Sequence, residues 1–171
     1  MNANPNAISA EADVLHCGYN LGFFEKADIA GWADRLIEAT ETPTDEMLDL
    51  SMNRHIHPMD VLRLLRTFGA AEPATSIETQ IGFIGLLLSQ QRITTQLAIQ
   101  GLWALLYEPG TTEQQQSIID YLDDCYDLAL AGSYGTLENV QQDLITFVLP
   151  YAQRLAAQYP QLIPSKTGDT P

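Results

Sequence analysis

Four aspartates in the second half of the chain have the spacing at which side chains share one face of a helix. They follow the pattern i, i+3, i+4 and i+7, and on a helix they would fall within an arc of about 100°. No Lys or Arg occurs between Arg92 and Arg154, so no nearby cation in the sequence offsets their charge. Such a face would suit a basic partner. Most runs of charged residues, however, are simply solvated helix surfaces, and we favour this second interpretation. The four residues are Asp120, Asp123, Asp124 and Asp127.

Two tyrosines are interleaved with these aspartates. Tyr121 and Tyr126 would lie at the margin of the acidic face, where a ring supplies contact area and the carboxylates steer a partner. We therefore predict a partner-binding surface of the four aspartates together with Tyr121 and Tyr126. The alternative, that the tyrosines are half-buried core residues, stays open.

A five-residue segment within the same stretch resembles a known metal-binding motif. Residues 123–127 match the DDxxD pattern of helical prenyl-diphosphate synthases, in which carboxylates hold magnesium against a diphosphate. Such enzymes are much longer, carry a second acidic motif on a facing helix and bind the diphosphate with basic residues. The surrounding stretch has no basic residue, so we interpret the match as chance.

Other residues that could do chemistry do not form a convincing set. His55 and His57 would offer two imidazoles to a metal, but a third ligand at a defined spacing is lacking, and a polar loop before Pro58 is favoured. No Ser or Cys lies in a recognisable nucleophile elbow, and no glycine-rich loop has the phosphate-binding pattern. We predict no catalytic residue, no metal and no cofactor. A carboxylate-rich metal-dependent enzyme or metal-binding protein remains the alternative.

Composition limits the classes of partner. The 171 residues include 22 Asp and Glu against 8 Lys and Arg, giving a formal net charge of −14. This excess repels phosphate backbones and anionic membrane surfaces, so neither nucleic acid nor membrane is an expected partner. It favours a basic protein partner, a cation, or solubility alone. The oligomeric state is left open.

The cysteines and the apolar runs indicate the cellular compartment of the protein. Cys17 and Cys125 lie far apart without CxxC spacing, and we interpret them as reduced, mostly buried thiols. The first residues lack the basic start and apolar run of a signal peptide. The most apolar run, Ile81–Leu88, is too short to span a bilayer. We predict a cytoplasmic protein.

Helical periodicity positions all of these residues, and the alternation typical of strands is nearly absent. Thr44, Ser76 or Thr75, and Thr112 are expected N-caps, with Thr75 and Glu78 forming a capping box. Pro150 should kink or split the last helix. Helices are expected at about residues 9–20, 26–39, 113–131 and 136–158. Four more are expected between them: a short one after Thr44, one after Pro58 that reaches Phe68, one that begins after Thr75 or Ser76 and contains Ile77–Leu88, and one that contains Leu97–Leu106.

These elements predict an all-α fold, with about eight antiparallel helices in a layered bundle. The length fits one domain, assigned to residues 1–160. Residues 161–171 are rich in Pro, Ser, Thr and Gly, which predicts a flexible C-terminal tail.

Residues Leu21–Met52 resemble a segment of small acidic all-helical bacterial proteins of uncharacterised or toxin-immunity type. They include Gly22-Phe23 and Trp32-Ala33-Asp34, followed by a helix that begins after Pro43 and contains Leu48-Asp49-Leu50-Ser51. The resemblance covers about a fifth of the chain. It implies a helical protein that binds and neutralises a cognate toxin, and it carries no catalytic residue.

Three functions are consistent with the sequence, and we give them in descending order of preference. The first is a cytoplasmic protein-binding module, most concretely an immunity protein that neutralises a bacterial toxin through its acidic surface. The second is the carboxylate-rich metal-dependent enzyme or metal-binding protein. The third is a structural or oligomerisation module in which exposed apolar residues mediate self-association.

Overall fold

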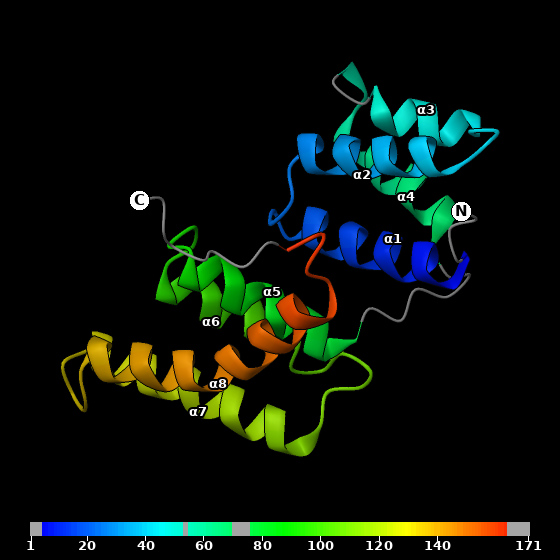
Figure 1. The fold of residues 1–171 in the computed structure, drawn as a ribbon. Helices are drawn as coiled ribbons and strands as arrows, with labels where there is room; N and C mark the ends of the chain where they lie inside the picture. Colours follow the sequence, from blue (N-terminus) through cyan, green and yellow to red (C-terminus); the bar gives the residue numbers. More distant parts are fainter. Residues whose placement is uncertain (1–4, 53–54, 70–75, 164–171) are drawn as a thin grey trace, which may run out of the picture. The chain divides into compact units, whose positions relative to one another are not determined.

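The structure is a computed structural model that describes residues 5–52, 55–69 and 76–163. Over these ranges the chain forms eight α-helices and no strand, which confirms the predicted all-helical class (Figure 1). They are α1 (Pro5–Asn20), α2 (Lys26–Ala39), α3 (Asp45–Ser51), α4 (Pro58–Phe68), α5 (Ile77–Ser89), α6 (Thr95–Trp103), α7 (Glu113–Leu130) and α8 (Leu137–Gln158).

The helices group into two compact units. One comprises residues 1–75 together with 159–171, and the other comprises residues 76–158. In the first unit α1 packs against α4, and α2 packs against α3. Trp32 of α2 is fully buried there, and its indole nitrogen donates to Glu11 Oε2 at 2.8 Å. The Trp32 ring also meets Phe68 edge to face, with ring centroids 5.7 Å apart.

The C-terminal end of the described chain belongs to this first unit. Leu162 and Ile163 are buried, and the Gln161 side chain donates to Glu11 Oε1 at 2.6 Å. Residues 161–163, which the sequence assigns to a flexible tail, therefore pack within the unit, because composition does not reveal that two apolar residues are buried. Residues 164–171 lie outside the described part, so the flexible tail there and the single domain over residues 1–160 stay predictions.

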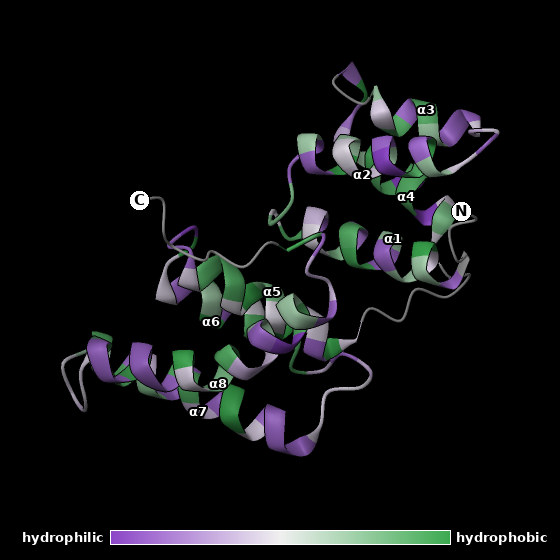
Figure 2. Cartoon of the chain, in the orientation of Figure 1, coloured by the Kyte–Doolittle hydropathy of each residue, from purple (hydrophilic) through white to green (hydrophobic). Residues whose placement is uncertain are grey.

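The second unit is built around α5. Apolar residues cover almost every side of this helix, and α8 packs closely along it (Figure 2). A Cβ atom on Gly85 would come within 3.0 Å of the Val148 carbonyl oxygen, and one on Gly82 within 3.1 Å of the Tyr151 carbonyl oxygen. These glycines therefore allow the close helix packing expected of them. The core between the helices includes Ile81, Ile84, Ile99, Leu102, Ile119, Leu122, Leu144 and Val148.

Local capping explains why most helix bounds agree with the sequence. The hydroxyls of Thr44, Ser76 and Thr112 each accept the backbone N–H three residues later. For α5 the cap is Ser76, whereas the expected capping box partner Thr75 lies outside the described residues. Glu78 forms an ion pair with Arg154.

The predicted end of α6 is wrong. The helix expected to reach about residue 106 ends at Trp103, and the buried Leu105 and Leu106 lie in the following turns. Their carbonyl oxygens accept hydrogen bonds from the Thr111 hydroxyl and the Gln116 amide, which satisfies them outside a helix.

Two other predictions compare with the structure as follows. The first helix begins at Pro5, earlier than the expected start near residue 9. Of the two outcomes expected at Pro150, a kink or a split, the split is absent, since α8 runs through this proline as one helix.

Candidate functional site

The four predicted aspartates lie on the outer side of α7. Asp120, Asp124 and Asp127 are exposed, and Asp123 is half-buried. The opposite side of the helix is anchored by Leu122, which is buried in the core of the second unit. The structure therefore brings the four carboxylates onto one face, as their spacing predicts.

The buried side of α7 is centred on Leu122. Ile119 is also fully buried, whereas Ile118, Cys125 and Ala129 are only partly buried against the core. Asp123 lies four residues after Ile119, on the same side of the helix, so it is half-buried at the edge of the acidic face.

The charge of this face is not neutralised by the described residues. The ion pairs Asp60–Arg63 and Glu78–Arg154 do not involve α7. The pKa of Asp123 is raised, first by burial and then by the neighbouring carboxylates. Those carboxylates belong to Asp127, Asp124 and Asp120. The face is thus a locally repulsive patch of negative potential.

The two tyrosines occupy opposite margins of the acidic face. Tyr126 is half-buried and packs against the core. Tyr121 is exposed, and its pKa is raised first by a hydrogen bond with Cys125 and then by the nearby charges of Cys125, Asp143 and Tyr134. Tyr121 therefore lies at the margin of the acidic face that is nearer α8.

A cleft lies on that side, between α7 and α8, with a volume of about 640 Å³. Two helical stripes face each other across it. The α7 stripe contains Gln114, Gln115, Ile118, Tyr121 and Leu122. The α8 stripe contains Asp143, Thr146, Phe147, Pro150, Tyr151 and Arg154, and the lining is completed by Thr112 and by Glu78 of α5.

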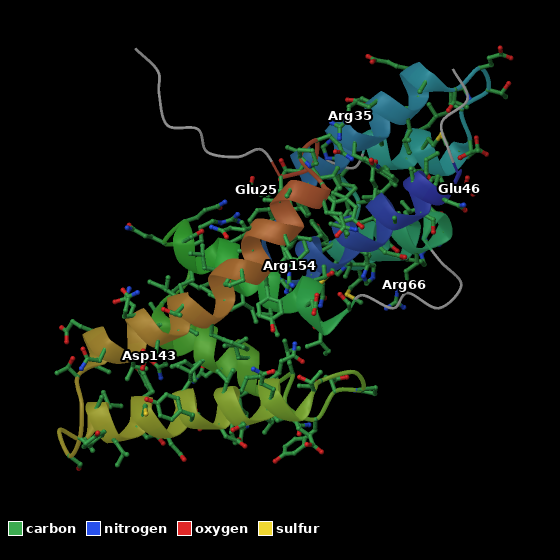
Figure 3. All side chains as sticks on the ribbon, turned by 60° about the horizontal axis from the view of Figure 1, so that its bottom comes forward. Glu25, Arg35, Glu46, Arg66, Asp143 and Arg154 are labelled. Atoms are coloured by element: carbon green, nitrogen blue, oxygen red, sulfur yellow. The ribbon has the colours of Figure 1, made fainter. Side chains whose placement is uncertain are left out.

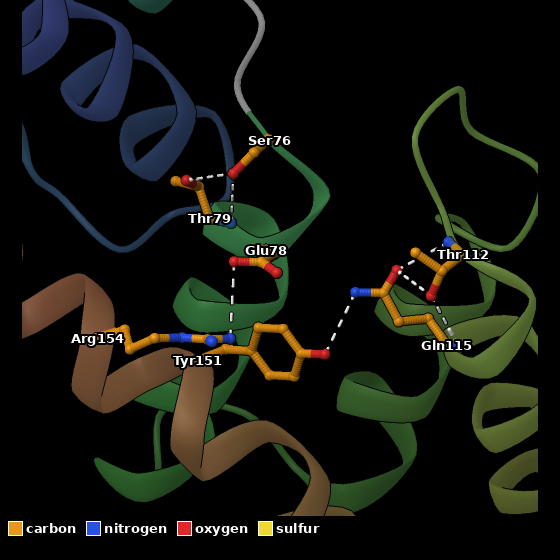
Figure 4. Close-up of polar contacts among 7 residues, drawn as sticks. All are labelled: Ser76, Glu78, Thr79, Thr112, Gln115, Tyr151 and Arg154. Atoms are coloured by element: carbon orange, nitrogen blue, oxygen red, sulfur yellow. Dashed lines mark hydrogen bonds and ion pairs between the residues drawn. The ribbon is translucent and has the colours of Figure 1, made fainter.

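A polar network holds one end of the cleft together (Figure 4). The side-chain oxygen of Gln115 accepts hydrogen bonds from the Thr112 backbone N–H at 2.9 Å and from the Thr112 hydroxyl at 3.1 Å. The side-chain NH₂ group of Gln115 donates to the Tyr151 hydroxyl at 3.2 Å. Arg154 lies over the Tyr151 ring, 4.8 Å from its centroid, and pairs with Glu78 at 3.6 Å. The cap of α7 is thereby tied to α8 and, through Arg154, to α5.

The other end of the cleft carries an anionic group. Asp143 lies about three helical turns before Arg154 on α8, and both residues are labelled in Figure 3. Asp143 is exposed and has no ion pair in the described part of the chain. The two ends of the cleft therefore differ in charge, because Arg154 is matched by Glu78 and Asp143 is unmatched.

Two of the three histidines have structural partners, and the third, His55, is exposed. His57 is the N-cap of α4, and its Nδ1 accepts the Met59 backbone N–H at 3.2 Å. His16 Nε2 accepts from Arg66 Nε at 3.1 Å, and the pKa of His16 is lowered by burial and by Arg66, partly offset by Asp13. Among the described residues, no three His, Cys, Asp or Glu side chains gather as a possible metal site.

The cysteines and the helices add two further findings. Both thiols are free, Cys17 buried and Cys125 half-buried, and burial raises the pKa of Cys17 to about 12. None of the helices in the described part combines the length and the apolarity needed to cross a membrane.

Sequence reasoning missed the cleft because a cleft requires two helices in register. Its signal is nevertheless present in each helix, as apolar and aromatic residues at helical spacing beside the core positions. On α8 these are Phe147, Pro150 and Tyr151, and on α7 they are Ile118, Tyr121 and Leu122.

No protein-family model matches the chain, and no curated protein or solved structure matches it either. The resemblance of residues 21–52 to toxin-immunity proteins accordingly stays a prediction.

Proposed function

We propose that this chain is a protein-binding module that holds a basic partner protein on the acidic face of α7. Its most concrete form is an immunity protein that neutralises a cognate bacterial toxin in the cytoplasm. The observation that carries the proposal is the uncompensated charge of Asp120, Asp123, Asp124 and Asp127.

Mutual repulsion of these carboxylates supports the proposal. Each like-charged pair at helical spacing costs a few tenths of a kcal/mol, so about 1 kcal/mol of folding stability is given up on this face. A cationic surface placed on it would relieve that repulsion and gain attraction at the same time. The free energy lost in the unbound protein therefore adds to the preference for a basic partner.

The geometry also suits rapid recognition. The carboxylates lie on a rigid helix whose opposite side is fixed by Ile119 and Leu122, so the face needs no rearrangement on binding. A concentrated negative patch accelerates encounter with a basic surface, and salt weakens that acceleration. A toxin that acts on nucleic acid or nucleotides needs a basic surface, which this face would cover.

The test is co-expression with the product of the adjacent gene, since an immunity protein is normally encoded beside its target. Rescue of growth and co-purification of the two proteins are the expected results. Replacing all four aspartates by asparagine should weaken the complex at least tenfold, with most of the loss in the association rate at low salt.

A matched variant separates local from overall charge. Glu38, Glu41, Asp49 and Glu108 are exposed and are not part of α7, and their replacement by the corresponding amides changes the net charge equally. This variant should bind nearly as well as the unmodified protein. Equal affinities for all three proteins would remove the α7 face from the binding site, and absence of any complex would reject the immunity function.

A further inference from the structure

The cleft between α7 and α8 has the size of a small-molecule site. Its volume of about 640 Å³ lies within the range of ligand pockets, roughly 300–1,000 Å³. Its walls combine the rings of Tyr121, Phe147 and Tyr151 with the aliphatic side chains of Ile118 and Leu122. Aromatic and aliphatic walls with a few polar groups are typical of sites for ligands with an apolar body.

A carboxylate lies at one end of the α8 side of this cleft. Asp143 is exposed, lines the cleft and has no ion pair in the described part of the chain. An ionised carboxylate only accepts hydrogen bonds, and a positively charged donor forms the strongest hydrogen bonds with it. Arg154, the cation of the cleft lining, is held at the other end by Glu78 and the Tyr151 ring.

We propose that the α7–α8 cleft binds a small amphipathic primary amine in its ammonium form. The ammonium group lies against the Asp143 carboxylate, and the apolar body packs against Phe147 and Tyr121. A primary ammonium has three N–H donors and one positive charge, which matches this carboxylate. The site is separate from the acidic face, which lies on the far side of α7, so it does not depend on the proposed partner-binding function.

Three naphthalene compounds of similar size and different charge test the proposal. They are 1-naphthylmethylammonium, the neutral 1-naphthalenemethanol and the anionic 1-naphthylacetate. Calorimetric titration into the full chain should give the tightest binding for the ammonium, about fivefold tighter than the alcohol, as expected for one solvent-accessible charge pair. The anion should bind weakest.

One substitution in the cleft and one outside it locate the effect. Asp143→Asn should reduce the ratio of ammonium to alcohol affinity to about one. Asp124→Asn, on the acidic face, removes the same charge from the molecule and should leave the ratio unchanged.

The ratio also protects the test from general effects on folding, since a poorly folded variant would lose both ligands together. Backbone amide NMR shifts on adding the ammonium compound should cluster at residues 118–122 and 143–151. Equal binding of the ammonium and the alcohol, a ratio that falls equally in Asp124→Asn, or shifts centred on the four aspartates would each overturn the proposal.

Discussion

At the scale of single residues, His16 links the stability of the first unit to pH. Its Nε2 accepts a hydrogen bond from Arg66, which requires an unprotonated nitrogen, and its pKa is lowered from the ordinary 6.5 by burial and by Arg66. The unfolded chain therefore binds a proton more readily than the folded one. The stability associated with neutral His16 is present above about pH 6.5 and is lost as the pH falls through the lower folded pKa.

We predict that His16→Gln removes this part of the pH dependence, because glutamine offers Arg66 a neutral acceptor that does not titrate. Urea unfolding at about pH 7.5 and about pH 5.5 measures the effect. The unmodified protein should lose more stability between these values than the variant. The same loss in both proteins would show that His16 is protonated equally well in the folded and unfolded states.

Burial gives the two cysteines different reactivities. Cys17 is 7% exposed and its pKa is raised to about 12, so almost no thiolate exists at neutral pH. Cys125 is half-buried beside Tyr121. We predict that an aromatic disulfide reagent modifies Cys125 rapidly in the native protein and modifies Cys17 only as fast as the chain opens.

Absorbance of the released thiolate measures both phases. The variant Cys125→Ser should lack the fast phase, and Cys17→Ser should lack the slow one. Urea should accelerate the slow phase alone. A fast phase that survives Cys125→Ser would contradict the burial of Cys17.

At the scale of elements, the contact of α5 with α8 depends on glycine. A Cβ atom on Gly85 would meet the Val148 carbonyl oxygen at 3.0 Å and the Ala152 Cβ at 3.1 Å, and neither atom can move without shifting α8. Overpacking of this kind costs about 1–3 kcal/mol, and the better helix propensity of alanine returns about 1 kcal/mol. We predict that Gly85→Ala destabilises the protein by about 1 kcal/mol in urea unfolding.

Gly31 in α2 is the matched control. A Cβ atom there meets nothing within 4 Å, so Gly31→Ala should stabilise the protein by about 0.5–1 kcal/mol through helix propensity alone. Opposite signs for the two substitutions are the expected result. A stabilising Gly85→Ala would mean that α5 and α8 pack less closely than the structure shows.

Helix bounds were largely predictable because capping is local. The cap at Thr112 and the stops at Asn20 and Ala39 need only a few neighbouring residues to be recognised. The end of α6 was not predictable, since the hydrogen bonds that satisfy Leu105 and Leu106 come from Thr111 in the following loop and from Gln116 of α7.

The candidate site also has one part that the sequence predicts and one part that it does not. The acidic face is a property of one helix, so spacing alone places its four members together. The cleft combines α7 with α8, and no pattern within one helix brings Tyr121 and Asp143 to the same site. Pro150 was recognised as a disturbance of the helix, but its place in the lining of a cleft depends on the helix that faces it.

At the scale of the whole molecule, the net charge of −14 opposes the compact state through self-repulsion. The acidic face of α7 adds a local contribution, which appears in the raised pKa of Asp123. A raised folded pKa means that the charged form is disfavoured on folding, so stability falls as the pH rises through that pKa. At neutral pH the full penalty is present.

We predict that replacing the four aspartates by asparagine raises stability at low salt by on the order of 1 kcal/mol. The gain should shrink near 1 M NaCl, where the Debye length falls to about 3 Å and the carboxylates are screened.

The variant with amides at residues 38, 41, 49 and 108 changes the net charge by the same amount. It should gain less, because its residues are spread over several elements. Equal gains would assign the penalty to total charge, and a gain that persists at high salt would mean that asparagine improves the helix by some means other than relief of repulsion.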